Sequence, residues 1–207
     1  MLGLILKDLF TLKKNLRTMM LIVLIFMGFF AFFNSQIEFA ASFIIFFASI
    51  LSLSAFSFDK YCSWDSFALT MPISRNKIVG ARYLLVLLLV FVAAAMSLLL
   101  ILLFAQFKEI NPWQMMPSVY LMTALIIILL SVALPVIYKF GAERGRLLLI
   151  GLVLVPVMII QGTANAGLAL PYEQFFKLLA IFSLPFAFVC YGLSYHIAAK
   201  IYFNKEF

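Results

Sequence analysis

Few residues of this 207-residue chain carry side chains that could do chemistry. It has one histidine, His196, and two cysteines, Cys62 in a polar loop and Cys190 in an apolar segment. Two thiols without nearby histidines do not make a zinc site, so we expect two free thiols and a histidine at the membrane interface. The sequence also has no G-x-x-x-x-G-K-[ST] motif to cradle nucleotide phosphates. We therefore predict no catalytic, metal or cofactor site in this chain, and no enzyme activity.

The loop 59–82 is the most informative polar segment. It carries apolar residues at the i, i+3, i+4, i+7 spacing of one helix face, namely Trp64, Phe67, Ala68 and Met71. Pro72 ends such a helix, and Ser74 caps a second helix that runs straight into the next apolar segment. Aromatic side chains on a short helix suit a groove on a partner protein. The same face suits a membrane surface equally well, and periodicity alone does not choose between them.

The elements that position this loop are predicted to be membrane-spanning helices. Apolar residues make up 66% of the chain and charged residues 11%, which is too little polar surface for a soluble domain. A spanning helix takes about 20 apolar residues. Such segments lie at 18–33, 37–58, 83–107, 117–138, 147–169 and 178–199, with a break at Asn111-Pro112-Trp113. We predict an all-α membrane protein of six spans, forming a single transmembrane domain over 1–207 without a nucleotide-binding domain.

Two of these spans are expected to be irregular. Pro156 interrupts the fifth, and the polar, glycine-rich run 161–167 does not suit a helix surrounded by lipid. Residues 161–176 are therefore predicted to form a re-entrant or external segment. Pro185 is expected to kink the sixth span.

The basic residues determine the predicted orientation. The net charge is +7, but the lysines and arginines sit in small groups beside apolar segments, which favours lipid over nucleic acid as the partner. With the N-terminus inside, 13 of the 15 fall in inner segments, and Lys108 and Lys177 fall outside. The positive-inside rule then places both termini in the cytoplasm.

Residues 1–17 are predicted to form an amphipathic helix in the membrane interface. Leucine and isoleucine recur at helical spacing, and Lys7, Thr11 and Lys14 line another face. Lys13 and Arg17 add to the basic character of the segment. The alternative is a ragged start to the first span. No small-x-small cleavage site follows, so we expect the span to be retained.

The segments 5–15 and 58–84 resemble small bacterial ABC-2 type permeases, and within that family the permease subunits of the phenol-soluble modulin exporter. The resemblance rests on the N-terminal Leu6-Lys7-Asp8-Leu9, on the pair Trp64-Asp65, and on the run Leu69-Thr70-Met71-Pro72-Ile73-Ser74-Arg75 with Ile78-Val79 after it. Met71 stands where the family usually has leucine, and the polar stretch after Lys60 is shorter than usual.

The resemblance implies a subunit of an ATP-driven exporter in the bacterial cytoplasmic membrane. Two permeases, identical or related, would form the path, and each would dock on a separate ATPase that binds ATP and Mg²⁺. Residues 60–71 would form the coupling helix, with Trp64 and Phe67 entering the ATPase. Polar contacts would come from Lys60, Asp65 and Arg75, and the N-terminal helix would form an interfacial elbow.

The substrate and the rival functions stay open at this point. Polar residues inside the spans, such as Ser97, Thr123 and Ser194, are expected to bond between helices rather than touch cargo. An amphipathic peptide, an antimicrobial compound or a lipid would suit the apolar spans. The alternatives are a non-transporting immunity, assembly or sensor protein, and a stand-alone channel or carrier, which the lack of charges in the predicted spans disfavours.

Overall fold

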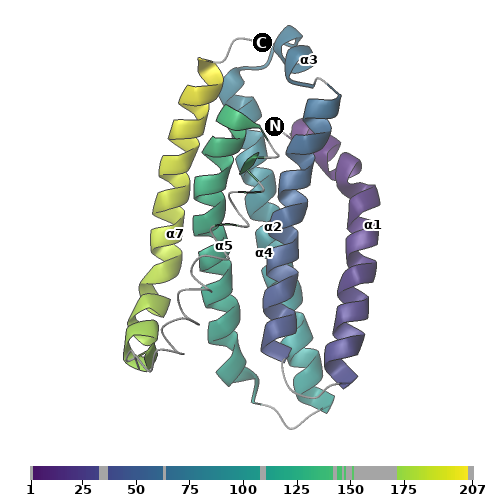
Figure 1. Ribbon diagram of the computed structural model, residues 1–207, viewed down its shortest axis with the longest axis vertical. Helices are drawn as coiled ribbons and strands as arrows, with labels where there is room; N and C mark the ends of the chain where they lie inside the picture. Colours follow the sequence, from purple (N-terminus) through teal and green to yellow (C-terminus); the bar gives the residue numbers. More distant parts are fainter. Residues whose placement is uncertain are drawn as a thin grey trace.

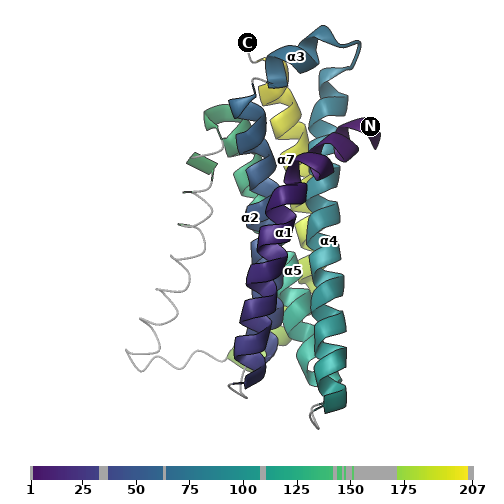
Figure 2. The same ribbon diagram turned by 90° about the vertical axis from the view of Figure 1, so that its right-hand side faces the viewer.

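The computed structural model describes residues 2–32, 37–62, 64–107, 111–141, 144–145, 147, 151 and 172–204. The regular structure of these residues is helical, and the elements are α1 (Leu2–Phe32), α2 (Ile37–Tyr61), α3 (Trp64–Thr70), α4 (Arg75–Phe107), α5 (Pro112–Phe140) and α7 (Tyr172–Phe203). The long helices run side by side, and the short helix α3 lies across one end of the bundle (Figure 1). The start of α1 and the C-terminal end of α7 lie toward that same end (Figures 1 and 2).

Four of the described segments are long and apolar enough to cross a membrane, namely Ala40–Tyr61, Arg75–Gln106, Pro112–Phe140 and Phe182–Phe203. They match the second, third, fourth and sixth predicted spans, which confirms a multi-pass membrane protein. The first predicted span falls in the second half of α1 and stays a prediction. The fifth lies outside the described residues except for Leu147 and Gly151. The helix α7 begins at Tyr172, so the last residues of the segment that was predicted to be re-entrant or external, 172–176, are helical.

Local sequence signals fix the ends of α5 and α4. Asn111 accepts a hydrogen bond on its side chain from the Trp113 backbone N–H, with Pro112 as the first helical residue. The helix ends at Gly141, whose φ of 92° is tolerated by glycine. The Ser74 carbonyl accepts bonds from the backbone N–H groups of Lys77 and Ile78, so α4 starts directly after the α3 loop, as predicted.

Small side chains bring α2 and α4 close together. The Ser97 hydroxyl lies 2.8 Å from the Ala41 carbonyl oxygen of α2 and 2.9 Å from the Ala93 carbonyl oxygen of its own helix. All three residues are buried. Other span hydroxyls bond to a carbonyl of their own helix, namely Ser49, Ser52, Ser54, Thr123 and Ser131. The predicted bonding between helices is therefore confirmed for Ser97 and for Ser194, which pairs with Tyr83 of α4, and is wrong for Thr123, whose hydroxyl bonds to its own helix.

The N-terminal segment differs from the predicted separate interfacial helix. Residues 2–32 form one helix, α1, whose first turns bend away from the axis of the rest (Figure 2). Ile5, Asp8 and Leu12 are buried, and the two apolar ones pack with residues of α2 and α4. Leu6 and Phe10 on another face are exposed. The first turns of α1 are thus attached to the bundle on one side, and their place in the membrane interface stays a prediction.

Candidate functional site

The short helix α3 is held across the end of the bundle by two tight connections. The Cys62 backbone N–H donates to the Phe58 carbonyl, which ends α2, and α3 begins at Trp64. After Thr70 the chain turns at Met71, whose N–H donates to the Ala68 carbonyl, and Pro72 follows. The predicted helix in this loop is confirmed. Met71, which was expected on its apolar face, lies just beyond its last residue because the chain turns there.

The predicted apolar face of α3 divides into an inward and an outward part. Ala68 is fully buried, and Trp64 is half-buried and packs against the main core. Phe67 is 55% exposed, although its ring centroid lies 5.5 Å from that of Trp64. Tyr61, at the end of α2, is 81% exposed. Phe67 and Tyr61 are therefore available to a partner, whereas Trp64 mainly attaches α3 to the bundle.

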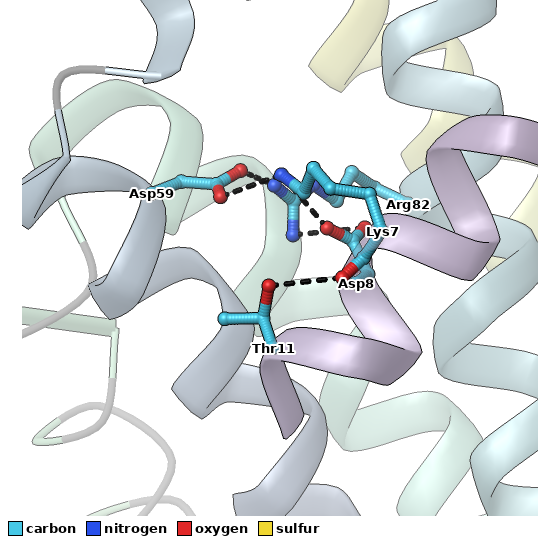
Figure 3. A network of polar contacts seen from close by, with 5 residues as sticks. All are labelled: Lys7, Asp8, Thr11, Asp59 and Arg82. Atoms are coloured by element: carbon cyan, nitrogen blue, oxygen red, sulfur yellow. Dashed lines mark hydrogen bonds and ion pairs between the residues drawn. The ribbon is translucent and has the colours of Figure 1, made fainter. Parts of the chain in front are cut away.

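Beneath α3, four charged side chains from three helices form a closed ring (Figure 3). Lys7 Nζ of α1 lies 2.9 Å from Asp8 Oδ1 and 2.8 Å from Asp59 Oδ1 of α2. The Arg82 guanidinium of α4 lies 3.1 Å from Asp8 Oδ2 and also pairs with Asp59 Oδ2. Each of the four carboxylate oxygens thus faces one cation. The Asp8 and Arg82 side chains are almost fully buried, and the Lys7 side chain, at 26% exposed, is the most open.

This charge ring, Lys7–Asp8–Asp59–Arg82, contacts α3 through a cation–π interaction. Lys7 Nζ lies over the Trp64 ring, 3.9 Å from its centroid, which is within the range of a cation–π contact. On the other side, the Arg82 guanidinium lies 5.2 Å from the Phe56 ring of α2. The charge ring therefore connects α3 with α1, α2 and α4.

Aromatic contacts continue from the charge ring to α5 and α7. The Phe56 ring meets the Tyr138 ring of α5 edge-on at 5.6 Å, and Tyr138 meets Tyr202 of α7 at 5.5 Å. Next to Arg82, the Tyr83 hydroxyl lies 2.8 Å from the Ser194 hydroxyl of α7. The Tyr191 hydroxyl donates to the Tyr83 carbonyl at 2.9 Å. Every long helix of the described chain thus contributes to one polar and aromatic layer below α3.

The other predicted site residues are distributed around this layer. Arg75 donates to the Phe203 carbonyl and stacks over the Phe203 ring at 5.6 Å, so it joins the start of α4 to the end of α7. It lines an open cleft of about 430 Å³ together with Ile73, Ser74, Asn76 and Phe203. Lys60, Lys13 and Arg17 are exposed. The side chains of Asp65 and Lys14 lie outside the described part of the chain.

Sequence reasoning missed the charge ring. The sequence predicts Lys7 on the polar face of the interfacial helix and Arg82 at the end of the inner loop, yet Arg82 lies within the span Arg75–Gln106 and is 5% exposed. One signal was present: Asp8 stands between Ile5 and Leu12 at the i, i+3, i+7 spacing of a single helix face. A carboxylate on an apolar face implies a buried cation nearby, because an unpaired buried charge is costly.

Comparison with known proteins gives one match. The sequence model of a family described as ABC-2 family transporter protein matches residues 3–203. No curated protein and no solved structure matches the chain. The match covers the charge ring, α3 and all of the membrane-spanning segments described above.

Proposed function

Because this chain belongs to the ABC-2 family of transporter proteins, we propose that it is the permease subunit of an ATP-driven exporter and works with a separate ATPase. The family and the apolar helices make it a transporter permease of the membrane. The proposal adds the direction of transport, the partner and the docking surface. It extends to two permeases per complex, identical or related, in a bacterial cytoplasmic membrane, with ATP and Mg²⁺ bound by the ATPase.

The observation that carries the proposal is the exposed aromatic surface at the end of the bundle. α3 presents Phe67, and α2 ends at the exposed Tyr61 just before α3, at the end of the bundle where α1 starts and α7 finishes. A short helix with an exposed aromatic ring suits a groove on another protein. α3 lies across the bundle end and not along its lipid-facing sides, which favours docking over membrane anchoring (Figure 1).

The charge distribution supports a cytoplasmic position for this surface. Lys60, Arg75 and Lys77 flank α3, and Lys139 and Lys200 stand at the ends of α5 and α7 on the same side of the bundle. The inner segments of the sequence hold 13 of the 15 basic residues. The positive-inside rule places such an end in the cytoplasm, where an ATPase has access to ATP.

The substrate is proposed to be amphipathic or hydrophobic and to move outward. The described spans carry few polar side chains that are not bonded within the bundle, and they expose phenylalanine, leucine and valine along α4 and α7. A path between two such permeases would suit a peptide, an antimicrobial compound or a lipid. Kinship with the phenol-soluble modulin exporter stays a prediction within this proposal.

The test is the co-purification of an ATPase with the tagged chain from bacterial membranes in mild detergent. Phe67→Ala should weaken the association about tenfold or more, because aromatic anchors contribute about 2 kcal/mol or more at an interface. Phe182→Ala is the matched control, since Phe182 is also exposed but lies at the start of the last span, away from α3. If wild type recovers no ATPase, or both variants retain it equally, the docking proposal is wrong.

A further inference from the structure

The charge ring combines features that a simple structural contact does not require. It places two carboxylates and two cations inside the bundle, with opposite charges alternating around a closed path. Buried ion pairs rarely stabilise a protein more than apolar residues of the same size would. Ionisable groups within membrane-spanning segments mark functional positions by default. The ring also joins α1, α2 and α4 to one another and contacts α3 through Lys7 and Trp64.

We propose that the Lys7–Asp8–Asp59–Arg82 ring is the device that transmits movement of α3 to α1, α2 and α4, with Lys7 and Arg82 as its positioning residues. The proposal rests on the proposed function, in which an ATPase moves α3. It assigns to named residues the connection between the docking surface and the spans. Lys7 contacts α3 through the ring of Trp64.

The chemistry of the two cations suits two different roles. Lysine is a compact charge on a flexible stem, and the Lys7 side chain is the most exposed of the four, so its ammonium can follow the Trp64 ring. Arginine is a planar, rigid fork that remains charged, and Arg82 is buried in α4 with its nitrogens on both carboxylates. Lys7 is therefore the movable contact, and Arg82 fixes the ring to α4.

The closed path makes the three helices respond together. If α3 shifts and Lys7 follows it, both carboxylates lose a partner unless Asp8 and Asp59 move as well. These aspartates belong to α1 and α2, and Arg82 holds both of them to α4. An uncompensated buried carboxylate is costly, so the joint movement of α1, α2 and α4 is favoured over the opening of the ring.

The experiment separates docking from transmission in the permease–ATPase complex reconstituted in nanodiscs. An environment-sensitive fluorophore attached through Gln106→Cys, in a Cys62→Ser and Cys190→Ser background, reports movement at the far end of α4, where Gln106 is exposed. Trp64→Leu removes the aromatic ring under Lys7 and keeps all four charges and Phe67. Trp64→Tyr keeps an aromatic ring for the ammonium and is the conservative control.

We expect Trp64→Leu to retain the bound ATPase while the ATP-dependent fluorescence change falls at least fivefold, and Trp64→Tyr to restore most of it. An unchanged response in Trp64→Leu with the ATPase still bound would overturn the transmission proposal and leave the docking proposal intact. Loss of the ATPase in Trp64→Leu would also overturn it, since Trp64 would then belong to the docking surface. Failure of wild type to bind any ATPase would defeat both proposals.

A second variant tests the ring itself without leaving an unbalanced charge. Asp59→Asn combined with Arg82→Gln removes one acid and one base, so that Lys7 and Asp8 still form a pair. If the ring transmits movement, this variant should still assemble with the ATPase, and its ATP-dependent fluorescence change should fall at least fivefold. A full response would show that the ring is a structural contact alone and would overturn the proposal.

Discussion

The charge ring and the hydroxyl contacts between helices both bury polar groups in the described part of the bundle, but they are built differently. Below α3, the charge ring gives every carboxylate oxygen of Asp8 and Asp59 a cation. Outside the ring, single hydroxyls bond from one helix to another, as Tyr83 does to Ser194 and Ser97 to the Ala41 carbonyl. Loss of a hydroxyl leaves a neutral group without its partner, whereas loss of a ring member leaves an unpaired charge. Sensitivity to substitution is therefore expected to concentrate at the four residues of the charge ring.

The largest effect is expected from Arg82→Gln. It leaves two buried carboxylates with a single ammonium, and such an uncompensated charge costs about 3 to 5 kcal/mol. The free energy of unfolding, from SDS titration of the purified protein, should fall by that amount. Lys77→Gln is the control, because Lys77 is exposed on the same helix. If the two variants had equal free energies of unfolding, the charge ring would be no more sensitive to substitution than the surface, and the contrast between ring and hydroxyl contacts would be wrong.

A smaller effect is expected from Tyr83→Phe. The substitution keeps the aromatic contacts with Tyr191 and Tyr195 and removes the hydroxyl that lies 2.8 Å from that of Ser194. One buried hydrogen bond contributes about 1 kcal/mol, and the same titration should show a loss of that size. Tyr61→Phe should have no effect, because Tyr61 is 81% exposed. A loss as large as that of Arg82→Gln would mean that hydroxyl contacts and charges matter equally.

The smallest effect is expected from Ser97→Ala. The hydroxyl shares its hydrogen between a carbonyl of α2 and one of its own helix, so its removal should cost about 0.6 kcal/mol, the average for hydrogen bonds between membrane helices. Ser52→Ala, whose hydroxyl bonds within its own helix, should cost less. A larger cost for Ser52→Ala would show that the contact between α2 and α4 depends on packing alone.

Sequence reasoning reached the local features of the site and missed its interior. The helix of the α3 loop, its end before Pro72 and the start of α4 after Ser74 follow from periodicity and capping, which act over a few residues. The sequence predicts Trp64 and Phe67 on one docking face, because equal helical spacing does not tell which side meets the bundle. Only the packing shows Trp64 turned toward Lys7 and Phe67 turned outward.

The amino-acid sequence alone was enough to predict that this protein lies in a membrane and in what order its helices follow along the chain. Long apolar segments require a membrane whatever their neighbours are, and the basic residues at one set of their ends predict a single orientation. The tertiary structure decided which charges are buried. Asp8, Asp59 and Arg82 are far apart in the chain, and each stands at the polar edge of an apolar segment. Only the packing of α1, α2 and α4 places them within ion-pair distance, where each charge makes the burial of the others tolerable.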